Sequence, residues 1–295
     1  MDIPLLERQQ TRNISRDRAA WVTGDGVQLR GEVGGVPTAP AVILMHGGGQ
    51  TLHSWSGGAS ALIEAGYRVI AYDARGHGDS GWSSTADYTL ATRARDLATI
   101  VQDIEGPFGL IGASLGGATA LKALSDGMRP KTVSLIDIVP KPDMEGVLRI
   151  RRFMKANPDG FGSLEDAADA VATFNVHRRR PRSPLGLARN LRLRSDGRYY
   201  WHWDPEILSF DPLQDLTELE EVLTTVVAAA DVAVQLVRGM KSDVVDDHGV
   251  AELRRLFPTL HVDEIPDAGH MVAGDRNDVF NHAIIAFFRK HLPSA

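Results

Sequence analysis

The segment Phe108–Gly117 reads FGLIGASLGG and joins a short apolar run to a glycine-rich turn. Within it, Gly112 to Gly116 matches the pattern Gly-x-Ser-x-Gly, with Ser114 at its centre. The apolar run predicts a buried strand, and the helical spacing of apolar residues in Leu115–Ser125 predicts a helix directly after the turn. A sharp strand-to-helix turn exposes the central hydroxyl at the carboxyl end of a sheet. The segment therefore predicts an α/β fold and a serine nucleophile.

Strand and helix patterns alternate on both sides of this segment. An Asp-Gly turn within Ala19–Val33 predicts a hairpin of two strands. The other predicted strands are Ala41–Met45, Arg68–Tyr72, Phe108–Ile111, Thr132–Ile138, Ala233–Val237 and Leu260–Ile265. The predicted helices are Leu52–Ala65, Ala91–Ile104, Leu115–Ser125, Gly249–Phe257 and Asp278–His291. This alternation predicts an eight-stranded, mostly parallel sheet flanked by helices.

The alternation stops between about Pro140 and Ala229, where the chain is richer in arginine and aromatic residues. Apolar spacing there predicts helices at Met144–Ala156, Leu164–Phe174, Pro184–Leu193 and near Leu213–Ala230, with an irregular segment at Tyr199–Asp204. We therefore predict a helical lid over residues 141–229, inserted into a core made of residues 1–140 and 230–295.

Composition narrows the classes of protein that remain. The 295 residues include no cysteine, which excludes disulfide scaffolds, thiolate metal sites and a cysteine nucleophile. The net charge of -6 argues against nucleic-acid binding. A secretory signal pattern and a membrane-spanning apolar stretch are both absent from the sequence, so we expect a cytoplasmic enzyme with a small-molecule substrate and no membrane partner. Phosphate-loop, dinucleotide and metalloprotease motifs are also absent, so we predict no metal and no organic cofactor. The composition leaves monomer and homodimer open.

Four motifs in order along the chain carry a family resemblance. They are His46–Gly49, Asp73–Ser80, the serine turn Gly112–Gly116, and Ala268–His270. With these motifs the chain resembles the α/β-hydrolase superfamily over nearly its whole length outside the insertion. It is most similar to the serine esterases, cofactor-free perhydrolases and carbon–carbon bond hydrolases that carry a helical lid.

The resemblance implies a catalytic triad and an oxyanion hole. Ser114 would be the nucleophile and His270 its base, because the family order is serine, acid, histidine. Asp243 matches the family's acid position after the Ala233–Val237 strand, and Asp137 is the alternative after the preceding strand. The backbone amides of Gly48 and Leu115 would form the oxyanion hole.

Aromatic residues gather in the insertion and predict an apolar pocket roof. We predict substrate contacts from Phe153, Trp201, His202 and Trp203 in the insertion, and from Gly49, Trp55 and Met271 in the core. Two other histidines have structural interpretations: His46 is expected to orient the glycine-rich loop after it, and the family uses the position of His77 to hold its own loop.

These features predict a serine hydrolase that cleaves a small-to-medium carboxylic ester or lactone with an apolar portion, through an acyl-enzyme on Ser114. The same triad would serve a carbon–carbon bond hydrolase of ring-cleavage diketones or a cofactor-free perhydrolase, so both stay open as alternatives. A non-catalytic receptor that uses the pocket only to bind a ligand is the alternative from a different class.

Overall fold

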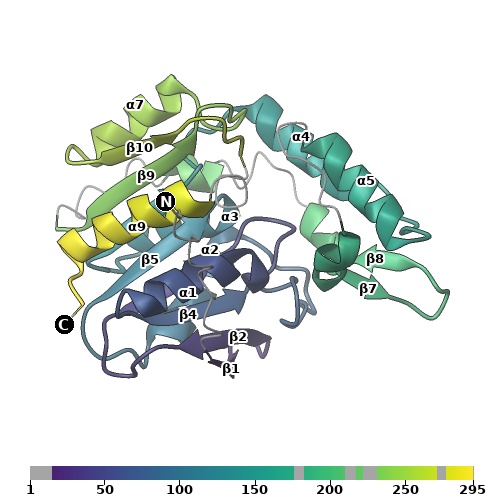
Figure 1. The fold of residues 1–295 in the computed structure, drawn as a ribbon, viewed down its shortest axis with the longest axis horizontal. Coiled ribbons are helices and arrows are strands. Elements are labelled where there is room, and N and C mark those ends of the chain that lie inside the picture. Colours follow the sequence, from purple (N-terminus) through teal and green to yellow (C-terminus); the bar gives the residue numbers. More distant parts are fainter. Residues whose placement is uncertain (1–14, 176–182, 210–216, 222–230, 271–276, 295) are drawn as a thin grey trace, which may run out of the picture.

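An eight-stranded sheet forms the centre of the computed structural model, which describes residues 15–175, 183–209, 217–221, 231–270 and 277–294 (Figure 1). The strand order is β1-β2-β4-β3-β5-β6-β9-β10. β2 runs antiparallel to both of its neighbours, and all other pairs are parallel. The predicted α/β fold is thereby confirmed. The bounds are β1 Arg16–Val22, β2 Gln28–Gly34, β3 Ala41–Met45, β4 Arg68–Asp73, β5 Phe108–Ala113, β6 Thr132–Ile136, β9 Ala233–Gly239 and β10 His261–Ile265.

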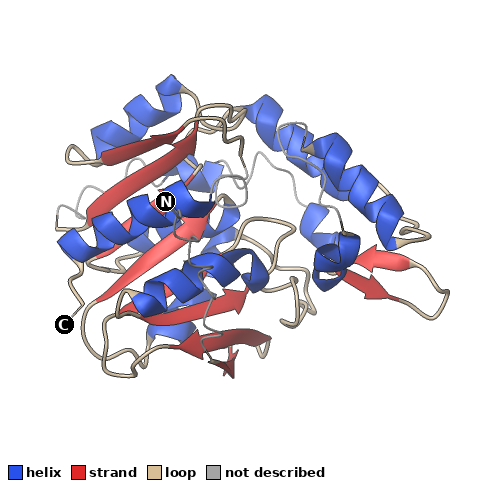
Figure 2. Cartoon of the chain, in the orientation of Figure 1, coloured by secondary structure: helices blue, strands red, loops and turns tan. Residues whose placement is uncertain are grey.

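Helices cover both faces of the sheet, because the central strands are apolar on both sides. One face packs against α2 (Leu90–Val101), α3 (Leu115–Ser125) and α7 (Asp247–Leu256). The other face packs against α1 (Ser56–Glu64) and α9 (Asn277–His291) (Figure 2). The predicted single helix Leu52–Ala65 begins as a 3₁₀ turn, η1 (Leu52–Trp55), before α1. Within the described ranges, no helix has the length and hydropathy that a membrane span needs.

The described residues between β6 and β9 form an insertion at the carboxyl end of the sheet (Figure 1). Its described elements are α4 (Met144–Lys155), α5 (Leu164–Phe174), η2 (Pro184–Asn190), β7 (Leu191–Leu193), β8 (Tyr199–Trp201) and η3 (Pro205–Leu208). The first two predicted helices are present. The predicted helix near Leu213–Ala230 lies mostly outside the described residues.

Two predictions within the insertion are wrong. The expected helix Pro184–Leu193 is a 3₁₀ turn that continues into β7, and the expected irregular segment at Tyr199–Asp204 begins with β8. β7 and β8 pair antiparallel around a turn in which the amide of Gly197 donates to the carbonyl of Arg194 at 3.0 Å. Gly197 takes a positive φ of 77°, which glycine adopts without strain, and the aromatic residues of β8 favour a strand.

Candidate active site

Ser114 occupies a strained turn between β5 and α3. Its backbone angles are φ 46° and ψ -111°, outside the regions that non-glycine residues normally adopt. The turn closes tightly: a Cβ at Gly112 would lie 2.4 Å from the backbone of Gly116, and one at Gly116 would lie 2.4 Å from the carbonyl oxygen of Met45. The amide of Ser114 donates to the carbonyl of Ile136 at 3.0 Å, which fixes the turn to β6. The predicted strand–serine–helix arrangement is therefore present.

Asp137, at the end of β6, is the carboxylate that contacts His270. Its Oδ2 lies 2.8 Å from His270 Nδ1, and the Asp137 side chain is fully buried. The same carboxylate accepts hydrogen bonds from the amide of Gly239 at 3.0 Å and from the hydroxyl of Ser242. A carboxylate in this setting only accepts, so Nδ1 of His270 carries its hydrogen and Nε2 is the nitrogen able to take up a proton.

Asp243, predicted to be the acid partner of His270, contacts a different side chain, and that prediction is wrong. Its carboxylate forms an ion pair with Arg149 of α4. Partial burial opposes ionisation, but the hydrogen bond and charge of Arg149 outweigh it and hold the pKa of Asp243 below its ordinary value. The turn after β9 aims Ser242, the preceding residue, at Asp137, and Asp243 then faces the insertion. The position that sequence reasoning kept as its alternative, Asp137, therefore takes the place beside His270.

Residues 47–50, the glycine loop, form a tight turn after β3. The Gln50 amide donates to the carbonyl of Gly47 at 3.1 Å, and Gly49 takes the positive φ of 72° that such a turn needs at its third position. A Cβ at Gly47 would lie 3.5 Å from Cβ of Ser114 because β3 and β5 are paired neighbours. Within the described residues, the amides of Gly48 and Leu115 donate to no carbonyl, and both residues line the cavity that contains Ser114.

Three buried histidines, His46, His77 and His202, surround the glycine loop and are called the histidine clamp below. Their rings lie close together, with centroids 5.1 Å apart for His46 and His77 and 5.9 Å apart for His77 and His202. Every ring nitrogen meets a backbone group: His46 meets the Gly47 carbonyl and Ala74 amide, His77 the Arg75 carbonyl and Gly49 amide, and His202 the Gly49 carbonyl and Gly78 amide. One nitrogen of each ring accepts an N–H, so all three rings are neutral in this arrangement.

His202 was expected to contact substrate, and the structure contradicts that expectation. It does not line the cavity around Ser114, and only 2% of its surface is exposed. Its Nδ1 accepts from the Gly78 amide at 2.7 Å, and its Nε2 lies 3.3 Å from the Gly49 carbonyl. The aromatic-rich run around it suggested a pocket wall, and its neighbours Trp201 and Trp203 do line the cavity. His202 lies just after the end of β8, and its ring is held between the two core loops instead. The expected orienting role of His46 agrees with its contacts.

Acidification is expected to destabilise the fold through this clamp. Burial lowers the pKa of His202 to about 3 and also lowers the pKa values of His46 and His77. Below about pH 6.5 the histidines take up protons in the unfolded chain but not in the folded clamp. The contribution of the clamp to the free energy of unfolding is therefore full above that pH and falls as the pH decreases. Each histidine contributes a loss of up to about 1.4 kcal/mol per pH unit. Urea unfolding at about pH 7.5 and about pH 5.5 measures this loss.

The matched control for this prediction is His202→Asn, which removes one titrating ring. Its unfolding free energy should fall with pH about one third less steeply than that of the parent protein. Equal slopes in the two proteins would contradict the prediction, as would an unfolding free energy that does not change between the two pH values.

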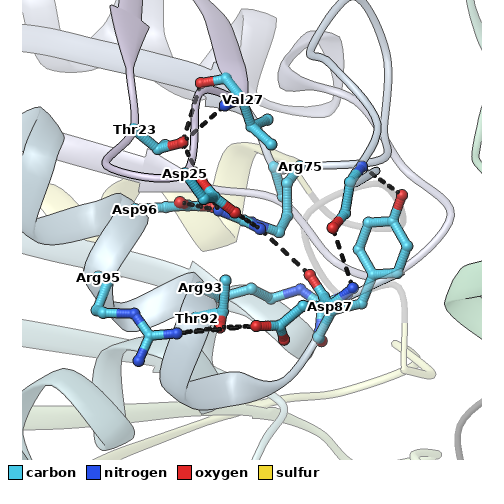
Figure 3. A network of polar contacts seen from close by, with 12 residues as sticks. Thr23, Asp25, Val27, Arg75, Asp87, Thr92, Arg93, Arg95 and Asp96 are labelled. Carbon is cyan, nitrogen blue, oxygen red and sulfur yellow. Dashed lines mark hydrogen bonds and ion pairs between the residues drawn. The ribbon is translucent and has the colours of Figure 1, made fainter. Parts of the chain in front are cut away.

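The loop that carries His77 is anchored by a buried arginine, Arg75 (Figure 3). Its guanidinium donates two hydrogen bonds of 2.6 Å to Asp96 and two, of 2.9 and 3.2 Å, to Asp25. Burial opposes the charge of Arg75, but the two carboxylates outweigh this effect and raise the pKa of Arg75. The hydrogen bond from Arg75 is in turn the main cause that lowers the pKa of Asp25. The network fixes the loop backbone, since the Arg75 carbonyl faces His77 Nδ1 at 3.1 Å.

A cavity of about 630 Å³ lies between the sheet and the insertion and contains both Ser114 and His270. Five of the predicted substrate-contact residues line it: Gly49, Trp55, Phe153, Trp201 and Trp203. Met271, also predicted, lies outside the described residues. The cavity walls also include Tyr88, Ile207 and Leu208, which the sequence did not suggest because they lie at helical or loop positions without a motif. A second groove of about 870 Å³ between β10 and α9 contains none of the motif residues.

A family model described as alpha/beta hydrolase fold matches residues 40–276. The esterase Rv0045c of Mycobacterium tuberculosis is 29% identical over 251 residues, which are 81% of this chain and 79% of that protein. A structure of this esterase superposes with a TM-score of 0.71 and 25% identity, and the superposition covers 93% of this chain and 91% of the other. Bovine protein phosphatase methylesterase 1 is 34% identical over 137 residues, 44% of this chain. The match spans about a third (36%) of the methylesterase's own length.

An alpha/beta hydrolase from Novosphingobium aromaticivorans has the same fold, with a TM-score of 0.77, 22% identity, and coverage of 94% of this chain and 99% of the other. The family model spans the glycine loop, the serine turn and His270. The chain therefore belongs to the alpha/beta hydrolase fold family.

Proposed function

We propose that this protein is a serine hydrolase that cleaves carboxylic esters through an acyl-enzyme on Ser114. The observation that carries the proposal is the shared cavity of a strained Ser114 and a His270 whose Nδ1 lies 2.8 Å from the buried carboxylate of Asp137. Hydrolase activity of the esterase kind also agrees with the family and with the esterase and methylesterase relatives.

In the proposed reaction, His270 Nε2 takes the Ser114 proton as the hydroxyl oxygen attacks the ester carbonyl carbon. Asp137 holds the imidazole in the required tautomer and stabilises the imidazolium that forms. The amides of Gly48 and Leu115 donate to the oxyanion that develops on the carbonyl oxygen. His270 then gives the proton to the departing alcohol, and water attacks the acyl-enzyme by the reverse sequence of proton transfers.

The cavity supports an apolar acyl group as the preferred substrate portion. Its described walls combine the aromatic residues Trp55, Phe153, Trp201 and Trp203 with aliphatic side chains from β6, α4 and η3. Burying such a group removes apolar surface from water, which favours binding by about 25 cal/mol per Å² before the costs of association. A volume of about 630 Å³ is within the ordinary range for small-molecule pockets, so we propose esters of small to medium acyl groups, with lactones as the cyclic counterpart.

A fluorophosphonate probe tests the proposal, because it reacts with an activated serine and stays attached. We expect one label on the wild-type protein, mapped by mass spectrometry to the peptide that contains Ser114, and none on Ser114→Ala. A series of p-nitrophenyl esters and lactones of increasing acyl length, assayed beside the probe, should show turnover that rises with apolar surface until the cavity is full. No label, or equal labelling of both proteins, would overturn the proposal.

A further inference from the structure

His202 comes from the insertion, yet it contacts the loop that follows β3. His202 and Gly49 are 153 positions apart in the sequence. The Gly78 amide can only donate, so Nδ1 of His202 is the acceptor and Nε2 carries the hydrogen that faces the Gly49 carbonyl. The tautomer of His202 is thus fixed by one core loop so that the ring can donate to the other.

The glycine loop is held at each of its peptide groups. The Gly47 carbonyl accepts from His46 Nδ1 at 2.8 Å and from the Gln50 amide. Because a trans peptide is planar, fixing this carbonyl also fixes the Gly48 N–H, which points the opposite way. On the other side of the turn, the Gly49 amide donates to His77 Nε2 at 3.1 Å, and its carbonyl faces His202. Without the His202 contact, the peptide between Gly49 and Gln50 would be held only by the hydrogen bond from the Gln50 amide to the Gly47 carbonyl.

Other contacts fasten the same part of the insertion to the core. The amide of Asp204 donates to the carbonyl of Gly76 at 2.9 Å, and the Asp204 carboxylate accepts from the hydroxyl of Tyr88. Trp203 packs beside the glycine loop, since a Cβ at Gly49 would lie 3.2 Å from its ring. This segment, residues 190–208, therefore contacts both the glycine loop and the loop that carries His77, so it can hold the glycine loop in place.

We propose that His202 is a positioning residue, whose hydrogen bond to the Gly49 carbonyl keeps the Gly48 amide aimed at the developing oxyanion. The inference rests on the proposed serine hydrolase function. The insertion thereby does more than cover the cavity: it supplies one of the supports that set the geometry of transition-state stabilisation.

Two substitutions at His202 separate its two contacts. In His202→Asn, the amide oxygen takes the place of Nδ1 and accepts from Gly78, but nothing reaches Gly49. In His202→Gln, the longer side chain places its NH₂ near the position of Nε2 and donates to Gly49. We expect kcat for a p-nitrophenyl ester to fall about 10- to 100-fold in the asparagine variant, with KM changed less than about 3-fold, because a loosened oxyanion donor affects the transition state more than substrate binding. The glutamine variant should recover most of kcat.

Arg192→Gln is the matched control. Arg192 links the insertion to the same core loop, by donating to the Gly78 carbonyl at 2.9 Å and Asp79 at 2.8 Å, but does not contact the glycine loop. We expect the parent kcat from this variant. An equal kcat loss in Arg192→Gln and His202→Asn would overturn the inference, because general attachment of the insertion would then explain the effect. Equal losses in the two His202 variants, or no loss in His202→Asn, would overturn it as well.

A readout that needs no turnover separates this inference from the proposed function. Hydrogen exchange of the peptide that contains Gly49 should be faster in His202→Asn than in His202→Gln or the parent protein, with the thermal midpoint confirming that all are folded. Unchanged exchange would overturn the clamp. If the parent protein shows neither ester turnover nor fluorophosphonate labelling, the proposed function fails while the exchange result stands independently.

Discussion

Replacing Ser114 by alanine is expected to lower kcat for ester hydrolysis by about 10⁵- to 10⁶-fold. Without the hydroxyl, no acyl-enzyme forms, and His270 and Asp137 have no nucleophile to activate. The remaining activity would come from the cavity and the oxyanion donors acting on water alone. Steady-state kinetics with a p-nitrophenyl ester, on protein purified free of host esterases, measures the loss.

Alanine at this site also removes a polar atom without creating a large cavity, so the variant should fold. Ser60→Ala on α1 is the matched control and should keep the parent kcat. The Ser60 hydroxyl donates to the Ser56 carbonyl within the helix. Ser114→Ala should bind a non-hydrolysable amide analogue of the substrate with an affinity within a few-fold of that of the parent enzyme. Direct binding gives the affinity of the variant, and inhibition of ester hydrolysis gives that of the parent. Retention of more than about a hundredth of the parent kcat would rule out Ser114 as the nucleophile.

The second large effect is expected from Asp137→Asn, which should lower kcat by about 10³- to 10⁴-fold. The volume is unchanged, but an amide cannot stabilise the imidazolium, and its NH₂ can donate to His270 Nδ1 and so favour the unproductive tautomer. Steady-state kinetics with a p-nitrophenyl ester measures the loss of kcat.

Asp243→Asn is the matched variant, with the same chemical change one strand away. Its ion pair with Arg149 is about 40% exposed on each side, so its loss should cost less than about 1 kcal/mol of stability. We expect its kcat to stay within about 10-fold of the parent value, because the substitution affects the reaction only through weaker support of α4. The variant with the larger loss of kcat identifies the triad acid. A larger loss in Asp243→Asn than in Asp137→Asn would show that Asp243, the residue that the sequence favoured, is the acid.

The sheet and the serine turn could be predicted from the sequence because their signals are local. Continuous apolar runs specify buried strands whatever follows. The glycines on both sides of Ser114 are required because a Cβ at either would lie 2.4 Å from backbone atoms, of Gly116 in one case and of Met45 in the other. His270 was equally accessible to sequence reasoning, since it follows the last strand and precedes the last helix in family order.

The acid could not be assigned in this way, because both candidates end neighbouring parallel strands at the same edge of the sheet. Which carboxylate reaches His270 depends on the direction of one side chain in the turn after β9, where Ser242 rather than Asp243 points inward. One signal was available: Asp137 interrupts an apolar strand, and a fully buried carboxylate must find donors nearby. The partner of Asp243, Arg149, lies 94 positions away and has no motif.

The attachment of residues 190–208 to the core limits how freely the insertion can be exchanged between relatives. Helices α4 and α5 contribute cavity walls, and the contacts that join them to the core include the partly exposed pair Arg149–Asp243. The segment from β7 to η3 instead provides hydrogen-bond partners for the backbone of two core loops. For a designer of chimeric enzymes, the natural crossover points therefore lie around α4 and α5, and a graft that replaces the later segment removes part of the core's own hydrogen bonding.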